Sequence, residues 1–211
     1  MTSELLYKFE RELYKKGIEL VSGIDEAGRG CLAGPVVAAC VILKKEASFK
    51  YVDDSKKLTE KQRELALKEI LDSAISIGVS FIDSKEIDKI NIYQASKLAM
   101  ETCINNMDIK PKYLLIDAMK IKTDIPFESI IKGDSKSVSI AAASIVAKTS
   151  RDAYMKEMDL IFPEYNFKSN KGYGTKDHLD ALNKFGITEM HRMTYAPIRE
   201  ILDRNKLTLF D

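Results

Sequence analysis

Three short apolar segments of this chain each lead directly into acidic residues. They are Val21–Ile24 before Asp25 and Glu26, Tyr113–Ile116 before Asp117, and Ile130–Gly133 before Asp134. Apolar runs of this length are typical of buried strands. The ends of strands in one sheet can converge, so the pattern predicts an α/β fold with four carboxylates gathered at one edge of a sheet.

The remaining periodicity predicts how helices and strands alternate. Strands are expected at 18–24 and 35–43, joined by a glycine turn, and then at 75–82, 113–116 and 129–132. Helices are expected at 3–16, 59–71, 92–106, 137–158, 176–185 and 197–204, with Thr59 and Gln62 forming a capping box. The antiparallel strands come first and then alternate with helices, which predicts a mixed β-sheet flanked by helices with a helical C-terminal appendage. The expected divisions are an N-terminal helix (1–17), a central domain that contains the four acids (18–162) and a C-terminal helical region and tail (163–211).

Composition restricts the class of protein. The 211 residues include 45% hydrophobic and 31% charged side chains, as in an ordinary globular protein. A net charge of +1 does not exclude a nucleic-acid partner, because binding depends on where the charge lies. The three cysteines match no zinc motif, and the chain contains no secretory signal or membrane-spanning run. We therefore expect a cytoplasmic monomer that keeps its thiols reduced.

Four clustered carboxylates require a partner charge. Asp25, Glu26, Asp117 and Asp134 would repel one another unless a cation lay among them. A hard divalent cation with oxygen ligands, Mg²⁺ or Mn²⁺, removes that cost. Taken singly, an aspartate at a strand end also suits a turn, and Asp134 could cap the following helix. The repetition of the arrangement is what favours a metal site.

A glycine-rich turn follows the paired acids. Gly28-Arg29-Gly30 could bring backbone N–H groups close to a phosphate, with Arg29 adding a positive charge. A plain hairpin turn would use the same glycines. Neither a P-loop nor a dinucleotide-binding fingerprint is present, which disfavours nucleotide triphosphates and dinucleotides as ligands.

Together these segments closely resemble the ribonuclease HII (type 2 ribonuclease H) family of bacteria. The resemblance covers roughly residues 18–198. It is carried, in order, by Gly23–Gly30, Leu32–Ala39, Asp53–Leu58, Leu114–Asp117, Lys132–Asp134, Ser139–Lys148, Gly172–His178 and His191-Arg192. The chain departs from the family pattern at Cys31, where proline is usual, and at Ala118, where glycine is common.

The resemblance implies a ribonuclease H-like fold and an endonuclease that hydrolyses the RNA strand of RNA/DNA hybrids. It also implies cutting 5′ of ribonucleotides embedded in duplex DNA, by in-line attack of water with two Mg²⁺ or Mn²⁺ ions, giving a 5′-phosphate and a 3′-hydroxyl. The implied catalytic and metal-binding residues are Asp25, Glu26, Asp117 and Asp134. The implied substrate-binding residues are Gly28, Arg29, Gly30 and Tyr173, whose ring would pack on the sugar.

Eight basic residues between positions 56 and 192 are expected to contact phosphates of the duplex. Lys56 and Lys176 are the foremost, and the wider set is Lys57, Lys136, Lys148, Lys168, Lys171 and Arg192. His178 is interpreted as a residue at the start of a helix rather than a metal ligand.

The end of the chain and the rival functions complete the expectations. Leu207–Phe210 resembles the short peptide with which proteins dock on the bacterial sliding clamp, although an end packed on its own domain would look the same. A DNA-specific nuclease or resolvase of the same fold would need the acids without Gly28–Gly30 and Tyr173. A nucleic-acid-binding module without catalysis is the second alternative. Ribonuclease HIII, a closer relative, usually has an extra N-terminal domain, for which residues 1–17 are too short.

Overall fold

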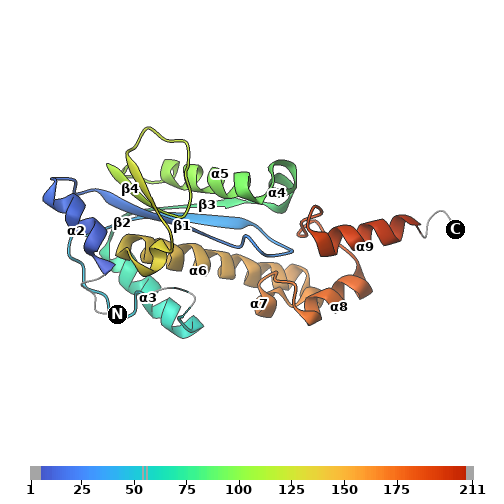
Figure 1. Cartoon of the computed structure of the whole chain (residues 1–211). Coiled ribbons are helices and arrows are strands. Elements are labelled where there is room, and N and C mark those ends of the chain that lie inside the picture. Colours follow the sequence, from blue (N-terminus) through green and yellow to red (C-terminus); the bar gives the residue numbers. More distant parts are fainter. Residues whose placement is uncertain (1–5, 54, 56, 208–211) are drawn as a thin grey trace.

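The computed structural model describes residues 6–53, 55 and 57–207, and of residues 205–207 it describes the backbone alone. In chain order the elements are α2 (Lys8–Lys15), β1 (Val21–Ala27), β2 (Val36–Leu43), α3 (Glu60–Ser73), β3 (Ala74–Ile82), α4 (Ser84–Ile90), α5 (Ile92–Asn105), β4 (Tyr113–Asp117), β5 (Phe127–Ile130), η1 (Gly133–Ser135), α6 (Val138–Ile161), η2 (Pro163–Tyr165), α7 (Phe167–Asn170), α8 (Lys176–Phe185) and α9 (Ala196–Leu207). Figure 1 shows their arrangement.

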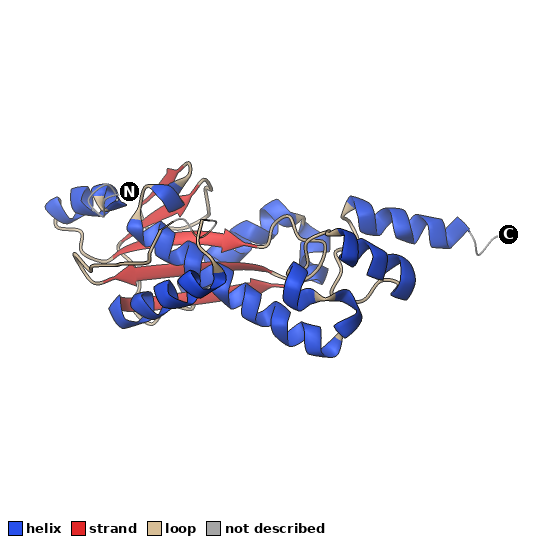
Figure 2. Cartoon of the chain, turned by 90° about the horizontal axis from the view of Figure 1, so that it is seen from below, coloured by secondary structure: helices blue, strands red, loops and turns tan. Residues whose placement is uncertain are grey.

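The strands form one mixed sheet (Figure 2), and their order across it is β3-β2-β1-β4-β5. The pairs β1–β2 and β2–β3 are antiparallel, whereas β1–β4 and β4–β5 are parallel. The predicted mixed sheet is therefore confirmed. The parallel pairs matter most for function, because they bring the carboxyl ends of β1 and β4 to the same edge.

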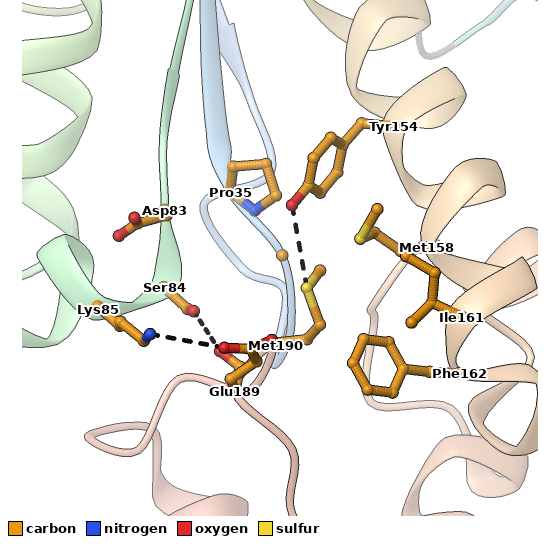
Figure 3. Close-up of a pocket in the computed structure, with 11 residues that line it drawn as sticks. Pro35, Asp83, Ser84, Lys85, Tyr154, Met158, Ile161, Phe162, Glu189 and Met190 are labelled. Carbon is orange, nitrogen blue, oxygen red and sulfur yellow. Dashed lines mark hydrogen bonds and ion pairs between the residues drawn. The ribbon is translucent and has the colours of Figure 1, made fainter.

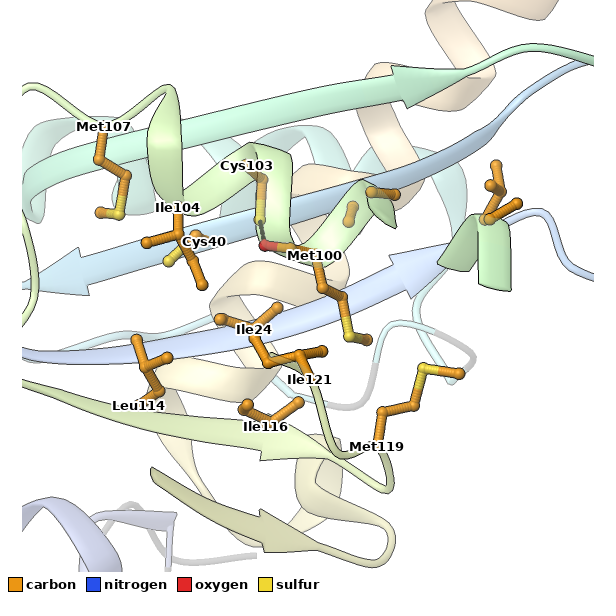
Figure 4. Close-up of a cluster of buried hydrophobic side chains, with 14 of the residues drawn as sticks. Ile24, Cys40, Met100, Cys103, Ile104, Met107, Leu114, Ile116, Met119 and Ile121 are labelled. Carbon is orange, nitrogen blue, oxygen red and sulfur yellow. Dashed lines mark hydrogen bonds between the residues drawn. The ribbon is translucent and has the colours of Figure 1, made fainter. Parts of the chain in front are cut away.

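Helices cover both faces of the sheet (Figure 1). On one face α5 packs on a core that includes Ile24, Cys40 and Leu114, with Met100 and Cys103 from the helix (Figure 4). On the other face the long helix α6 and α3 enclose a second apolar cluster. All three cysteines of the chain are buried free thiols, as predicted.

The C-terminal helices extend beyond one end of the sheet (Figures 1 and 2). They have their own apolar cluster, which includes Met155 from α6, Phe167 from α7 and Leu182 from α8. The predicted helical C-terminal region is confirmed, and the boundary predicted at 162 falls where α6 ends. The division into separate domains stays a prediction. Within the described residues, no helix combines the length and apolar character needed to cross a membrane.

The sequence-based assignments differ from the structure at a few places. The capping box of Thr59 and Gln62 is present as predicted. The strand expected at 129–132 lies instead at Phe127–Ile130, because pairing with β4 selects those residues and Lys132 then adopts a left-handed conformation with φ 56°. The helices α4 and α7 were not predicted, since both are too short to show a clear periodicity.

Candidate active site

Strand register brings two of the predicted acids together. In the parallel pair of β1 and β4, Ile24 lies opposite Ile116, so the next residues, Asp25 and Asp117, extend from neighbouring strands at the same level. Both line one cleft of about 480 Å³, together with Glu26. All three lie within the last residues of their strands rather than after them. The convergence predicted from the three apolar segments is therefore observed for these three carboxylates.

Asp134 lies beside this group in the short helix η1. Its side chain is buried, with 4% exposed, and it does not belong to the residues that line the cleft. The preceding residue, Gly133, donates its N–H to Asp117 Oδ1 at 2.7 Å, which fixes η1 against the end of β4. The cap of α6 is Ser137, whose side chain accepts from the Ile140 N–H, so Asp134 is not the helix cap.

Burial and mutual repulsion dominate the electrostatics of the cleft. Burial raises the pKa of Asp25 well above its usual range, and the charges of Glu26 and Asp117 raise it further. Burial also raises the pKa of Glu26, although Arg29 opposes this shift; Arg29 Nη1 lies 3.3 Å from Glu26 Oε1. A cation placed among these carboxylates would stabilise their ionised form and offset both effects.

The donor set fits a hard divalent cation. Carboxylate oxygens are the ligands that Mg²⁺ and Mn²⁺ prefer, and Glu26 Oε2 is buried without a hydrogen-bond partner. Across the part of the chain that the structure describes, no three Asp, Glu, His or Cys side chains are arranged to hold an ion as they stand. The four-residue ligand set therefore stays a prediction, supported by the shared cleft of three acids and the adjoining position of the fourth.

The Gly28–Gly30 turn forms another wall of the same cleft. Gly28 has a φ of 97°, and a Cβ there would lie 2.1 Å from Arg151 Nε, so both conformation and space require glycine. At Gly30 an added Cβ would meet nothing within 4 Å. The turn is therefore tightly supported from behind at Gly28 and open to a ligand at Gly30.

Arg192 also supports this turn, through its carbonyl oxygens, and is not a phosphate contact. Its side chain is fully buried and donates to the carbonyl oxygens of Gly28 at 2.7 Å and Arg29 at 2.8 Å. The prediction that Arg192 would contact phosphate is therefore wrong. In the sequence, an arginine within a motif suggests a surface cation. In the structure, this arginine donates hydrogen bonds to carbonyls of a loop more than 150 residues away in sequence.

Tyr173 lines the same cleft as the acids, as predicted for a substrate-binding residue. The residue is 44% exposed, which leaves its ring accessible. Its backbone N–H donates to the Asn170 carbonyl at 2.9 Å, and its carbonyl accepts from the Thr175 N–H at 2.8 Å. A tight turn therefore presents the ring.

The predicted lysines are placed unequally. Lys148 lines the cleft and is paired with Asp152 at 2.7 Å. Lys176 is the exposed first residue of α8 and does not line the cleft. Lys56 lies outside the described residues.

Sequence reasoning missed three polar residues of the cleft, namely Ser55, Arg63 and Ser144. The hydroxyls of Ser55 and Ser144 are 2.6 Å apart, and Ser144 also contacts Asp25. Both serines lie in motifs that had been recognised, which was an available signal. Nothing in the sequence distinguished Arg63 from the solvated charges of its helix.

Comparison with known proteins decides the family. The family model described as ribonuclease HII matches residues 22–198. The chain belongs to the ribonuclease HII family. A ribonuclease HII of Bacillus cytotoxicus is 52% identical over 200 residues, which are 95% of this chain and 77% of that protein. One of Enterococcus faecalis is 52% identical over 195 residues, covering 92% and 76%.

Solved structures share the ribonuclease H-like fold. Ribonuclease H2 from Pyrococcus horikoshii matches with a TM-score of 0.75 and 25% identity over 88% of this chain and 98% of that one. Ribonuclease HII of Archaeoglobus fulgidus, solved in a complex with PCNA, matches with a TM-score of 0.71 and 25% identity over 84% and 95%. Bst-RNase HIII in complex with Mn²⁺ shares the fold with a TM-score of 0.65 at 16% identity, over 89% of this chain and 70% of that one. As a member of the ribonuclease HII family, the chain is a hydrolase that cleaves RNA paired with DNA.

Proposed function

We propose that the cleft formed by Asp25, Glu26, Asp117 and the Gly28–Gly30 turn hydrolyses the RNA strand of RNA/DNA hybrids and cuts 5′ of single ribonucleotides embedded in duplex DNA. The products are a 5′-phosphate and a 3′-hydroxyl, formed by in-line attack of water. The observation that carries the proposal is that one cleft holds the acids, the glycine turn and Tyr173 together. A DNA-specific nuclease or a non-catalytic module would not require that combination.

The acids and their neighbours suit a metal-dependent reaction. Asp25, Glu26, Asp117 and Asp134 would hold Mg²⁺ or Mn²⁺, with two ions during catalysis. Bound ions supply an activated water and neutralise charge on the leaving oxygen. The protein holds the Asp25 carboxylate in place through the Glu26 N–H, which donates to Asp25 Oδ1 at 2.7 Å.

Recognition of RNA depends on the 2′-hydroxyl. The Gly28–Gly30 turn presents a backbone that a ligand can approach at Gly30, and the half-exposed ring of Tyr173 lines the same cleft. We assign the turn to the 2′-hydroxyl and the ring to the neighbouring sugar. Arg29, Arg63 and Lys148 place positive charge on the same cleft, where phosphates of the backbone would lie.

The decisive experiment uses a DNA duplex with one embedded ribonucleotide, incubated with Mg²⁺ or Mn²⁺, with the cut position mapped. We expect a single cut 5′ of the ribonucleotide, no cut in the matching all-DNA duplex, and none with a chelator. Asp117→Asn should abolish the cut. Asp72→Asn, the same change at an exposed position of α3, should retain it. Cleavage of the all-DNA duplex, or cleavage that persists with the chelator, would contradict the proposal.

The C-terminal tail is a separate proposal. The sliding-clamp peptide predicted at Leu207–Phe210 begins at the last residue of α9 and otherwise lies outside the described residues. The complex of the Archaeoglobus fulgidus enzyme with PCNA supports a clamp partner for this family. Removing residues 207–211 should abolish retention on immobilised clamp, and unchanged retention would exclude the tail as the docking site. The cytoplasmic location and monomeric state stay predictions.

A further inference from the structure

Two buried histidines form an unbroken hydrogen-bond chain that ends on Tyr173. His178, in α8, places Nδ1 2.9 Å from the Tyr173 carbonyl oxygen. Its Nε2 lies 3.1 Å from Nε2 of His191. His191 Nδ1 in turn lies 3.0 Å from the Thr188 backbone nitrogen and 2.9 Å from the Thr188 hydroxyl. Both rings are at most 1% exposed.

The end groups decide which ring nitrogens carry protons. The backbone N–H of Thr188 can only donate, so Nδ1 of His191 accepts and its proton lies on Nε2. The carbonyl of Tyr173 can only accept, so His178 carries its proton on Nδ1 and offers a bare Nε2 to His191. A proton on His191 Nδ1 could reach the Thr188 carbonyl only at 3.3 Å, and it would leave two bare nitrogens facing each other.

The surroundings keep this arrangement neutral and rigid. Burial lowers the pKa of both histidines, and with the adjacent His178 it lowers that of His191 to about 4. The ring of Phe167 meets His178 edge-on with centroids 5.4 Å apart, and Tyr165 lies 5.1 Å from His191. Neither imidazole can turn without displacing these aromatic rings.

The segment that supplies His191 is itself attached to the body of the protein. Ser84 Oγ donates to the Glu189 carbonyl at 2.8 Å, beside a pocket of about 280 Å³ (Figure 3). The Gly34 N–H donates to the Met190 carbonyl at 2.8 Å. The next residue after His191 is Arg192, which holds the Gly28–Gly30 turn. One short segment therefore supports the Gly28–Gly30 turn through Arg192 and the backbone of Tyr173 through His191 and His178.

We propose that His178 and His191 are positioning residues, which hold the backbone of Tyr173 in a fixed position relative to the Gly28–Gly30 turn. This fixed position allows the enzyme to recognise an embedded ribonucleotide. This inference rests on the role proposed above for Tyr173. The histidines touch neither substrate nor metal. They act through the Tyr173 carbonyl, whose position sets where the ring meets the sugar.

The test compares variants of His178 on two substrates, a duplex with one embedded ribonucleotide and a uniform RNA/DNA hybrid. His178→Phe keeps the aromatic packing and removes the side-chain donor to the Tyr173 carbonyl, which retains its hydrogen bond from the Thr175 N–H. It removes two buried hydrogen bonds, of which only the one to Tyr173 bears on substrate recognition. Loss of that bond should lower kcat/KM about tenfold on the embedded ribonucleotide and less than about twofold on the hybrid. His178→Asn, whose amide nitrogen falls near the position of Nδ1, should restore most of the difference.

Tyr165→Phe is the matched control. It removes a hydrogen bond to the Gly186 carbonyl in the same aromatic cluster while leaving the histidine chain intact, so the ratio of the two kcat/KM values should not change. A His178→Phe enzyme that loses both activities equally would overturn the positioning role, because a loss of folded enzyme cancels in the ratio. If Tyr173→Ala itself leaves the ratio unchanged, the role proposed for Tyr173 fails instead.

A second measurement needs no variant. Nitrogen-15 spectra of the imidazoles in the wild-type protein should show two neutral rings at pH 7, with the proton on Nδ1 in one and on Nε2 in the other. Two rings of the same tautomer, or a protonated ring at that pH, would overturn the hydrogen-bond chain independently of any activity.

Discussion

Gly23 allows α6 to pack directly against β1, and replacing it should damage the active site from a distance. A Cβ at this position would lie 1.9 Å from the Ser139 carbonyl carbon and 2.2 Å from the Ile140 nitrogen. Ordinary contact begins at 3.4 Å, so Gly23→Ala requires α6 to move away by about 1.5 Å. Both obstructing atoms are backbone, and no side-chain rotation can relieve the clash.

The cost can be estimated from opposing effects. Overpacking costs about 1–3 kcal/mol, and a backbone clash of this depth belongs at the upper end. Alanine also restricts the unfolded chain, which stabilises by about 0.4–1 kcal/mol. We expect a net loss of about 2 kcal/mol in the free energy of unfolding. Because α6 carries Ser144 beside Asp25, a displacement above 1 Å should also lower turnover about a hundredfold.

Gly78→Ala is the matched control. A Cβ there would lie 1.9 Å from the Cys103 carbonyl oxygen of α5, and none of the residues lining the cleft comes from this helix. Urea denaturation should show similar losses of stability for the two variants. Hybrid cleavage under native conditions should fall steeply only for Gly23→Ala. Equal activities in the two variants, or unchanged stability of Gly23→Ala, would refute the reasoning.

The remaining predictions concern charge and support in the cleft. Asp25→Asn removes a buried charge held beside two like charges, so with chelator present it should raise the midpoint of thermal unfolding by about 2–4 °C. A lower midpoint would contradict the repulsion. In the presence of metal, the same variant should cleave about a thousandfold more slowly. The folded-state pKa of His191, about 4, lies below its unfolded value of 6.5. The stability that this pKa difference contributes is therefore present in full above pH 6.5. It is lost as the pH falls towards 4, which lowers the free energy of unfolding by about 3 kcal/mol in total. The free energies of unfolding of wild type and His191→Phe, measured with urea, should converge over that pH range. Parallel pH profiles of the two proteins would refute the prediction. Arg192 donates from three separate nitrogens to the carbonyls of Gly28, Arg29 and Gly34. Lysine carries its donors on one nitrogen, so Arg192→Lys should leave at least one carbonyl without a donor and cost about 2 kcal/mol of stability. Hybrid cleavage should stay below wild type even at low temperature, where the variant is folded; full activity there would argue that the turn needs no such support.

Local patterns predicted much of the fold and the centre of the site. The apolar runs before Asp25 and Asp117 are strands, as predicted, because a run of this kind favours a strand through its own residues. In the structure the two strands are parallel neighbours. The glycine requirement at Gly28 was likewise visible in the sequence. Asp134 could not be placed so closely, since its position depends on the left-handed turn at Lys132 that leads into η1.

Long-range contacts were beyond the reach of the sequence. The prediction that Arg192 contacts phosphate is wrong because only the folded chain shows that its guanidinium lies among carbonyls of a distant loop. The pairing of His178 with His191 escaped notice for the same reason: thirteen residues of separation carry no periodic signal, and the contact exists only after α8 has packed on its cluster.

The length of α6 limits how the sequence of the enzyme can evolve. Along one helix, Ser139 abuts Gly23, Ser144 adjoins Asp25, Lys148 borders the cleft and Arg151 reaches the Pro35 carbonyl at 2.9 Å. A single residue inserted between Ser144 and Lys148 would turn everything beyond it by about 100° and move the later contacts away together. Insertions and deletions should therefore be confined to the loops, while α6 evolves by substitution at constant length.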